Sequence, residues 1–444
     1  MNVAAQIAIA VGSIAVLLAV MVAVRHHARK HDLSAEVQRK LVHIGTGLYA
    51  LTLPWLFADR WPVFMLVALT LVVMGVLRLP AIRSGLGATL HGVERQSWGD
   101  ILLALAVGTV FLLSQGESIL YILPIAVLAL ADAAAALTGS RYGRGFFQVE
   151  EGRKSIEGSV AFFMVTLILS MVCLLLLTQV GRANVIVLSI LVAAFGTLVE
   201  ADSWRGFDNF FLPAGLLVFL QSHMATPMPE LIALAVILLT AILGFLAIAR
   251  HLGLSTHTAR VYVVAIFLLL SVTTIENTVL PIMVFVAHAA ARIANPGTSA
   301  HPELDIVAAV AMISFAWLAL GLATGLNALA FYGLTAMGLC LGLIALALAP
   351  LSVVWRWIGG AVAAAALVWI HRLLLGTPGD GMIADLTWAG ETTSLAMACA
   401  AVAIAVPLVR PALFVRIRAA RLALLAMALP LGGYLWLAKE NTGW

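Results

Sequence analysis

The sequence predicts an all-α membrane protein, a polytopic bundle of roughly 14–16 transmembrane helices with its N-terminus outside. Of the 444 residues, 63% are hydrophobic and only 10% are charged, and the mean hydropathy is +1.08. A soluble domain is about half apolar and a quarter charged. Apolar runs such as residues 101–113 and 160–177 also lack the alternation of a transmembrane β-strand, so helices are the remaining way to satisfy the backbone in lipid.

The same composition excludes several other classes of protein. Cys173, Cys340 and Cys399 lie inside apolar runs, which argues against a disulfide scaffold. Charged residues are few and scattered, and the formal net charge is only +4, which excludes a nucleic-acid-binding tail. We therefore expect the membrane, and no nucleic acid, as a partner.

The first apolar run, residues 4–24, is expected to be a retained span. No positive charge precedes it, whereas a basic cluster follows at residues 25–30, and a signal peptide would show the reverse order. The positive-inside rule then places the N-terminus outside and this basic cluster in the cytoplasm.

The further apolar runs, each bounded by polar residues or by Gly and Pro, are also expected to be spans. They cover residues 40–58, 62–79, 99–115, 118–138, 158–180, 184–200, 209–222, 230–249, 259–275, 278–293, 304–325, 328–349, 351–372, 391–409 and 415–437. The side opposite the cytoplasm is then poor in basic residues, with Arg60 and Arg182 as exceptions. We therefore expect a multi-pass protein of the inner cell membrane.

Polar residues suitable for chemistry concentrate before residue 225. The segment 222–230, which contains Pro227 and Pro229, is the best candidate for a linker. We therefore expect a catalytic membrane domain at residues 1–225 and an additional multi-span domain of unknown function at residues 226–444. Four polar clusters mark the first domain, and the predicted topology opens all four to the cytoplasm, which itself predicts a site there.

The first cluster holds Arg39, Lys40 and His43 at the start of a span. Residues three and four apart share one face of a helix, so both cations and the imidazole are expected on the same side. Such a face could hold a phosphate. The alternative is a positive-inside anchor beside a histidine that a neighbouring helix satisfies.

The second cluster is centred on Asp132, about two turns inside the end of an apolar helix. A carboxylate there costs about 2.5–3.5 kcal/mol on the insertion scale, so a compensating contact is expected. Gly139, Arg141 and Gly143 would offer backbone N–H groups and a cation to phosphates, beside a metal ion held by Asp132. The alternative is a structural pair between Asp132 and an arginine.

The third cluster, Arg153, Lys154, Ser155 and Glu157, directly precedes a long span. The start of a helix favours an anion, so the first three residues are candidate phosphate ligands. Glu157 could bind a metal ion or take part in a capping box. The alternative is an ordinary cytoplasmic loop.

The fourth cluster carries three acids, Glu200, Asp202 and Asp208, followed by Asn209. Acids do not help to anchor a cytoplasmic boundary, and carboxylates beside a basic phosphate pocket suggest Mg²⁺ coordination or activation of a hydroxyl. Residues 209–213 are expected to interrupt the helix where it lines a cavity. Together, the four clusters fit phosphoryl or nucleotidyl transfer onto a lipid, which depends on positioning and charge stabilisation.

The clusters can be written as four motifs: Arg39-Lys40-x-x-His43, Asp132-x-Ala134-Ala135-x-x-x-Gly139-x-x-x-Gly143, Lys154-Ser155-x-Glu157-Gly158-Ser159, and Glu200 with Asp208-Asn209-x-x-x-Pro213. In order and spacing they resemble the dolichol kinase and phytol kinase family of CTP-dependent polyprenol kinases. The resemblance covers about residues 35–222.

The resemblance implies a transferase that moves the γ-phosphate of CTP, or of a related nucleotide, to the hydroxyl of an isoprenoid alcohol. Polyprenol, phytol, farnesol and geranylgeraniol are candidate alcohols, and Mg²⁺ is the implied cofactor. The implied catalytic residues are Asp132, Lys154 and Asp208. The implied nucleotide-binding residues are Arg39, Lys40, His43, Gly139, Arg141, Gly143, Arg153, Lys154 and Ser155. The implied metal ligands are Asp132, Glu157, Glu200, Asp208 and Asn209.

This sequence departs from the family pattern in three places. Ala133 stands where many relatives carry a hydroxyl residue, and Ser140 stands where a basic residue is common, so one metal or phosphate contact is in doubt at each position. The third departure is the added half, residues 230–444. Its segment Thr274-Ile-Glu276-Asn277 faintly echoes the fourth cluster, but the predicted topology places it outside.

Two other functions stay open at this stage. A phosphatidate cytidylyltransferase also uses CTP in the membrane, but it attacks the α-phosphate, and its late Pro-Gly-His-Gly-Gly stretch is absent here. A transporter or flippase of a lipid-linked saccharide would explain the many spans, yet no convincing internal repeat is found. Which acid serves as the base, which alcohol is bound and whether the protein forms a homo-oligomer also stay open.

Overall fold

The computed structural model describes residues 2–33, 35–57, 59–77, 98–149, 152–249, 251, 253–273, 275–326, 328–376 and 392–442. These ranges are almost entirely helical, which confirms the predicted membrane helix bundle. Ten of the described helices are long and apolar enough to cross a membrane. Further, shorter apolar helices lie at Trp61–Leu77, Gly99–Leu113, Thr256–Val272 and Thr393–Val409. Residues 78–97, between two of the predicted spans, lie outside the described residues, as does Thr274, the first residue of the segment that echoes the fourth cluster.

The chain forms two compact units, the first ending at Val264 and the second beginning at Ala265. The helices that follow the expected linker, α13 (Met228–Ala249) and the first half of α14 (Thr256–Val272), therefore fold with the first unit. The functional division at residue 225 stays a prediction.

The first unit contains the following elements before α13. They are α1 (Val3–Lys30), α2 (Ala35–Leu51), α3 (Leu53–Leu56), α4 (Trp61–Leu77), α7 (Gly99–Leu113), α8 (Ser118–Ala126), η1 (Val127–Ala131), α9 (Asp132–Tyr142), β1 (Phe146–Val149), β2 (Gly152–Ser155), α10 (Ile156–Leu177), α11 (Arg182–Asp202) and α12 (Asp208–His223).

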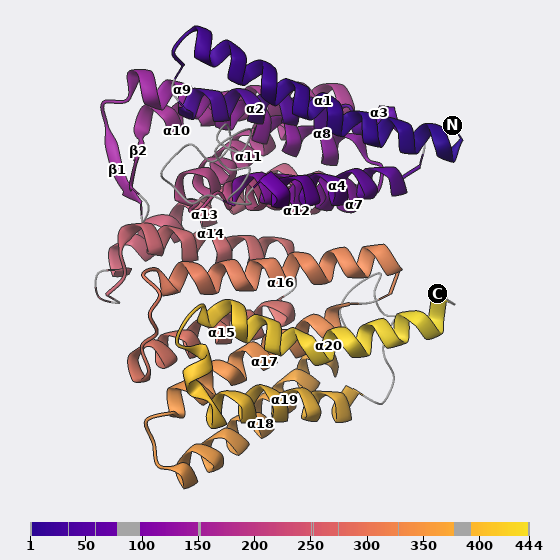
Figure 1. Ribbon diagram of the computed structural model, residues 1–444. Helices are drawn as coiled ribbons and strands as arrows, with labels where there is room; N and C mark the ends of the chain where they lie inside the picture. Colours follow the sequence, from indigo (N-terminus) through magenta and orange to yellow (C-terminus); the bar gives the residue numbers. More distant parts are fainter. Residues whose placement is uncertain are drawn as a thin grey trace. The chain divides into compact units, whose positions relative to one another are not determined.

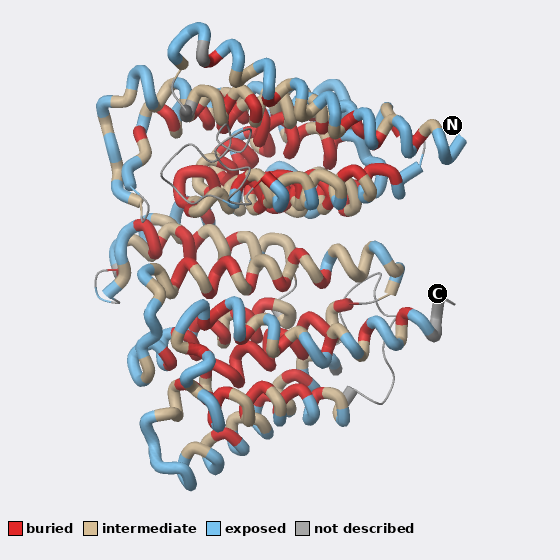
Figure 2. Tube along the Cα trace, in the orientation of Figure 1, coloured by how far each residue is buried: buried red, intermediate tan, exposed pale blue. Residues whose placement is uncertain are grey.

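One continuous apolar segment, Ser118–Tyr142, forms the centre of the first unit, and 78% of its apolar window is buried. It consists of α8, the π-helical turn η1 and α9, and it contacts α2, α10 and α12. The π-helical turn ends one residue before Asp132, and such turns often occur at functional sites. Figure 2 shows the buried residues gathered inside this unit, whereas much of α1 and of the β-hairpin is exposed.

A short antiparallel hairpin, β1 and β2, projects from the ends of α9 and α10 (Figure 1). Phe147 pairs with Lys154 across it. The sequence predicts only a loop here, because two four-residue strands are too short for a clear alternation pattern. The Ser155 side chain caps α10 by accepting from the Gly158 backbone N–H at 3.0 Å.

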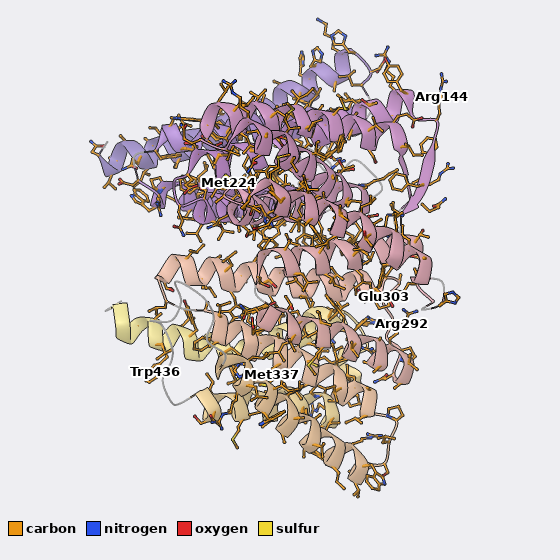
Figure 3. All side chains as sticks on the ribbon, turned by 180° about the vertical axis from the view of Figure 1, so that it is seen from behind. Arg144, Met224, Arg292, Glu303, Met337 and Trp436 are labelled. Carbon is orange, nitrogen blue, oxygen red and sulfur yellow. The ribbon has the colours of Figure 1, made fainter. Side chains whose placement is uncertain are left out.

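The second unit is a helical bundle around α17 (Leu329–Leu348), which contacts α15, α16, α18, α19 and α20. Its other elements are α15 (Ile275–Ala294), α16 (Pro302–Thr324), α18 (Val353–Gly376), α19 (Thr392–Val409), η3 (Pro411–Phe414) and α20 (Arg418–Thr442). An ion pair between Arg292 and Glu303 joins the end of α15 to the start of α16 (Figure 3).

Candidate active site

A buried ion pair joins the first two polar clusters. The Nζ atom of Lys40 in α2 lies 2.7 Å from each carboxylate oxygen of Asp132, the first residue of α9. Their side chains are only 8% and 6% exposed. His43, one turn after Lys40, places Nε2 3.5 Å from Asp132 Oδ2 and 3.1 Å from the Leu128 carbonyl oxygen. The compensating cation for Asp132 is therefore a lysine of the first cluster and not an arginine.

A second ion pair joins the third and fourth clusters. Lys154 of β2 lies 2.8 Å from Glu200 Oε1 at the end of α11, and it also donates to the backbone carbonyl of Glu200. Burial alone would lower the pKa of Lys154, but the carboxylates of Glu200, Asp208 and Asp132 together raise it. Lys154 is therefore a protonated ammonium group with carboxylates from three helices near it.

Asp208 and Asn209 begin α12, after a turn in which Arg205 and Gly206 adopt positive φ angles of 50° and 83°. The Asn209 side chain is buried and donates to the Gly206 carbonyl at 3.1 Å. No lysine, arginine or histidine in the described ranges forms an ion pair with Asp208, although its charge acts on Lys154.

The expected helix interruption at residues 209–213 was wrong, because α12 continues through Pro213. Pro213 is the sixth residue of α12, counting from Asp208. The only intrahelical bond lost is therefore the one to the carbonyl of Asn209, close to the helix start.

The glycines of the second motif bring α9 and α10 close together. A Cβ atom on Gly139 would lie 2.5 Å from Ser155 Oγ, and one on Gly158 would lie 2.9 Å from the Ala135 carbonyl oxygen. The sequence interpretation assigned Gly139 and Gly143 to phosphate binding. Here the Gly143 N–H donates to the Gly139 carbonyl at 3.2 Å, so close helix packing is the role that the geometry supports.

Glu157 holds the loop between α9 and β1. Its carboxylate accepts from the backbone N–H groups of Arg144 at 3.0 Å and Gly145 at 3.1 Å. It does not form a capping box, because the residue three positions after the Ser155 cap is Gly158. Figure 3 labels Arg144 in this exposed loop.

Two of the three arginines implied to bind nucleotide, Arg141 and Arg153, lie on the exposed surface of this region. Arg141 stacks over the Tyr142 ring at 5.5 Å, and Arg153 stacks over the Phe146 ring at 5.3 Å. Within the described residues, neither arginine forms an ion pair with Asp132 or Glu200. A nucleotide that contacts these two arginines would therefore have to extend from the buried ion pairs to the exposed surface.

A largely apolar cavity of about 120 Å³ opens beside the first ion pair. Apolar side chains of α1, α2, α4 and α7 line most of it, and Arg39, His43, Asp100 and Asn209 contribute polar groups. Arg39, Asp100 and Asn209 lie near the N-terminal ends of α2, α7 and α12, and His43 lies one turn after Arg39, so one end of the cavity is polar. From Arg39 to Ala50 the cavity follows α2 over twelve residues, a rise of about 16 Å along the helix.

Carboxylates converge here, but in the described residues no three His, Cys, Asp or Glu side chains are grouped as a ready metal site. Lys40 neutralises Asp132, and Lys154 neutralises Glu200. Of Asp132, Glu200 and Asp208, only Asp208 is held by no lysine, arginine or histidine of the described ranges, so its carboxylate would be the readiest of the three to hold a Mg²⁺ ion. The expected Mg²⁺ ligand set stays a prediction.

A curated phytol kinase of Synechocystis sp. is 34% identical to this chain over 214 residues, which cover 47% of this chain and 88% of that protein. This chain belongs to the dolichol and phytol kinase family. No family model matches the chain, and no solved structure matches it. The match leaves about half of the chain without a counterpart in that relative.

Within this kinase family site, sequence reasoning missed Asp100 and the apolar lining of the cavity. Asp100 is an acid in the first turn of the apolar helix α7, a signal like the one that marked Asp132. The lining residues carried no signal, because Thr46, Tyr49 and Thr70 lie in spans that look like ordinary membrane helices. Asp202 was placed in the fourth cluster, but it pairs with Arg260 of α14.

Proposed function

We propose that this protein is a membrane kinase that transfers the γ-phosphate of CTP, or of a related nucleoside triphosphate, to the hydroxyl of an isoprenoid alcohol. The observation that carries the proposal is the apolar cavity whose polar end, at His43, meets the Lys40–Asp132 pair. A long apolar alcohol and a charged phosphate donor have opposite requirements, and this arrangement supplies both within one unit.

The cavity fits the chain of an isoprenoid alcohol. Its lining is mostly Leu, Val, Met and Ala, which would bury an unbranched or methyl-branched hydrocarbon without unsatisfied polar groups. The hydroxyl would then lie at the polar end, within reach of His43 and Asn209. Diacylglycerol would be a poorer fit, because its two acyl chains need a wider groove.

The lysines supply the charge stabilisation that phosphoryl transfer needs. The alcohol oxygen attacks the γ-phosphorus, the bond from that phosphorus to the bridging oxygen breaks, and the nucleoside diphosphate leaves. Lys154 would neutralise charge on the transferring group, and Lys40 would hold Asp132 in place. The alcohol proton would pass to a carboxylate of this site.

Mg²⁺, when bound, would supply positive charge that offsets the negative charge of the phosphates. Asp208 would be its first protein ligand, with Asn209 beside it. Asp132 and Glu200 would become further Mg²⁺ ligands only if the phosphates of the nucleotide attract Lys40 and Lys154 away from them. The predicted topology places this reaction on the cytoplasmic face of the inner membrane.

The test is transfer of label from γ-radiolabelled CTP to farnesol, geranylgeraniol, phytol, undecaprenol and diacylglycerol by the purified full-length protein in lipid nanodiscs. We expect label in one or more isoprenoid alcohols and its loss in Lys154→Ala. Gln148→Ala, an exposed change on the neighbouring strand, is the matched control and should keep full activity.

Three results would contradict the proposal. Release of pyrophosphate with no labelled lipid would indicate a cytidylyltransferase. Label in diacylglycerol alone would show that the substrate is a diacylglycerol and not an isoprenoid alcohol. Equal activity in the wild type and in Lys154→Ala would exclude the site described above.

A further inference from the structure

Three elements meet around Lys154, and only two of them carry the family motifs. The hairpin strand β2 carries Lys154, and the end of α11 carries Glu200, which accepts its ammonium group. The third element is α14, which begins at Thr256, beyond the residues 35–222 that resemble the kinase family. The hairpin extends from α9 and α10 toward this helix (Figure 1).

α14 holds the end of α11 through Asp202. Arg260 Nη2 lies 2.7 Å from Asp202 Oδ1, and Arg260 Nε donates to the two carboxylate oxygens at 2.8 Å and 3.1 Å. His257, on the same helix, places Nε2 2.8 Å from the Asp202 backbone carbonyl oxygen. Asp202 is only 3% exposed, so this ion pair is shielded from water, unlike a surface pair.

Glu200 and Asp202 project from different sides of the same helix end. Each helical residue turns by about 100°, so two residues apart means about 200° around the axis. Lys154 therefore holds one side of the end of α11, and Arg260 holds the other. A change in the Arg260 contact would turn or loosen the helix end that presents Glu200.

Arg260 also touches the hairpin. Its guanidinium carbon lies 5.5 Å from the centre of the Phe147 ring. Phe147 is the direct cross-strand partner of Lys154. One side chain of α14 thus contacts the strand opposite Lys154 and the helix that carries the acceptor of Lys154.

We propose that Arg260 is a positioning residue of the kinase site, and that α14 sets the distance between Lys154 and Glu200 although it lies beyond the motifs of the family. The inference rests on the proposed phosphoryl transfer at Lys154. Arg260 touches no reacting atom in this arrangement, and it acts through the two residues that it holds.

The experiment compares Arg260→Met and Arg260→Lys in the full-length protein. We expect kcat to fall at least tenfold in Arg260→Met, with the KM for the alcohol unchanged, because the apolar cavity is not altered. Arg260→Lys keeps the charge but loses the planar guanidinium group, so it should recover part of kcat. Arg292→Met is the matched control, because it breaks an arginine–glutamate pair in the second unit and should keep wild-type kcat.

A second readout does not depend on kinase activity. The rate at which acetic anhydride modifies Lys154 is measured by mass spectrometry relative to the exposed Lys30. We expect Arg260→Met to raise this ratio at least fivefold, because Lys154 is released from Glu200, and Arg292→Met to leave it unchanged.

The two readouts separate the possible failures. If the wild type transfers no phosphate to any lipid, but Arg260→Met raises the acetylation of Lys154 relative to Lys30, the proposed function would be contradicted and the positioning contact supported. A folded Arg260→Met protein with wild-type kcat and an unchanged ratio would overturn the positioning role. So would losses of equal size in Arg260→Met and Arg292→Met, which would indicate a general effect on stability.

Discussion

Each unit of this protein is built around one buried helix, and the two helices differ in their chemistry more than in their burial. The apolar windows of Ser118–Tyr142 in the first unit and Leu329–Leu348 in the second are each 78% buried. The first contains a π-helical turn and Asp132. The second contains no charged residue.

The polar contacts of the two central helices show the same contrast. Asp132 is held by a lysine and lies beside a histidine. In the second unit, Thr335 accepts from Trp317 Nε1 at 2.9 Å, and Gly338 and Gly342 allow close approach of α20. A carboxylate in a membrane span costs about 2.5–3.5 kcal/mol, whereas a hydroxyl bonded within the bundle costs little. The two central helices are therefore equally buried, and a costly, paired charge distinguishes the one in the first unit.

The largest expected effect comes from removing the partner of the buried charge. Lys40→Met should lower the free energy of unfolding by about 3–5 kcal/mol, because Asp132 is left buried and unpaired. It should also abolish kinase activity. Thr335→Val in the second unit should cost only about 1–3 kcal/mol, the loss of one acceptor, and should keep activity. Denaturant titration in mixed micelles and the label-transfer assay measure the two quantities.

The double variant Lys40→Met/Asp132→Leu separates stability from chemistry. It should regain most of the lost stability, because no charge is left in the apolar interior. It should nevertheless stay inactive. An active double variant would show that the pair serves only the fold.

The next effect concerns Asp208, which forms no ion pair with a cation of the described ranges. Asp208→Asn should lower kcat about 100-fold and raise the Mg²⁺ concentration needed for half-maximal rate, because a neutral amide is a weaker ligand. Asp305→Asn in the second unit is the control and should change neither quantity. A Mg²⁺ titration of both variants checks this, and an unchanged Mg²⁺ requirement in Asp208→Asn would remove Asp208 from the ligand set.

Close glycine contacts in the two units should respond differently to an added methyl group. In Gly139→Ala the new atom meets Ser155 Oγ, the cap of α10, at 2.5 Å, so a cost of about 1–3 kcal/mol and reduced activity are expected. In Gly342→Ala it meets the end of the Leu422 side chain at 2.8 Å, which can rotate away. Thermal unfolding should therefore rank Gly139→Ala as less stable, and the reverse order would indicate that α9 and α10 can separate easily.

The smallest expected effect is on substrate choice. Thr70→Phe fills part of the cavity and should shift the preference toward shorter alcohols by about tenfold or less. Val72→Phe, on the same helix but 63% exposed, should leave the preference unchanged. Competition between farnesol and a longer prenol measures the shift, and equal behaviour of the two variants would place the alcohol elsewhere.

Sequence reasoning located the helices well, because transfer into lipid is decided by about 20 consecutive residues. It also named Lys40, Asp132, Lys154 and Glu200, since charges at membrane boundaries are few. Sequence reasoning did not predict the hairpin at residues 146–155. Two short strands satisfy each other only in pairs, so neither one carries a clear signal alone.

The sequence by itself determined that this chain lies in a membrane, that it is helical and which charged residues need partners. Only the tertiary structure decided the pairing. Lys40 pairs with Asp132, which lies 92 positions away in the sequence, and Lys154 pairs with Glu200, which lies 46 positions away. Arg260 reached Asp202 from a helix beyond the family motifs. Hydropathy depends on near neighbours in the chain, whereas an ion pair depends on where helices come together, and packing sets that position.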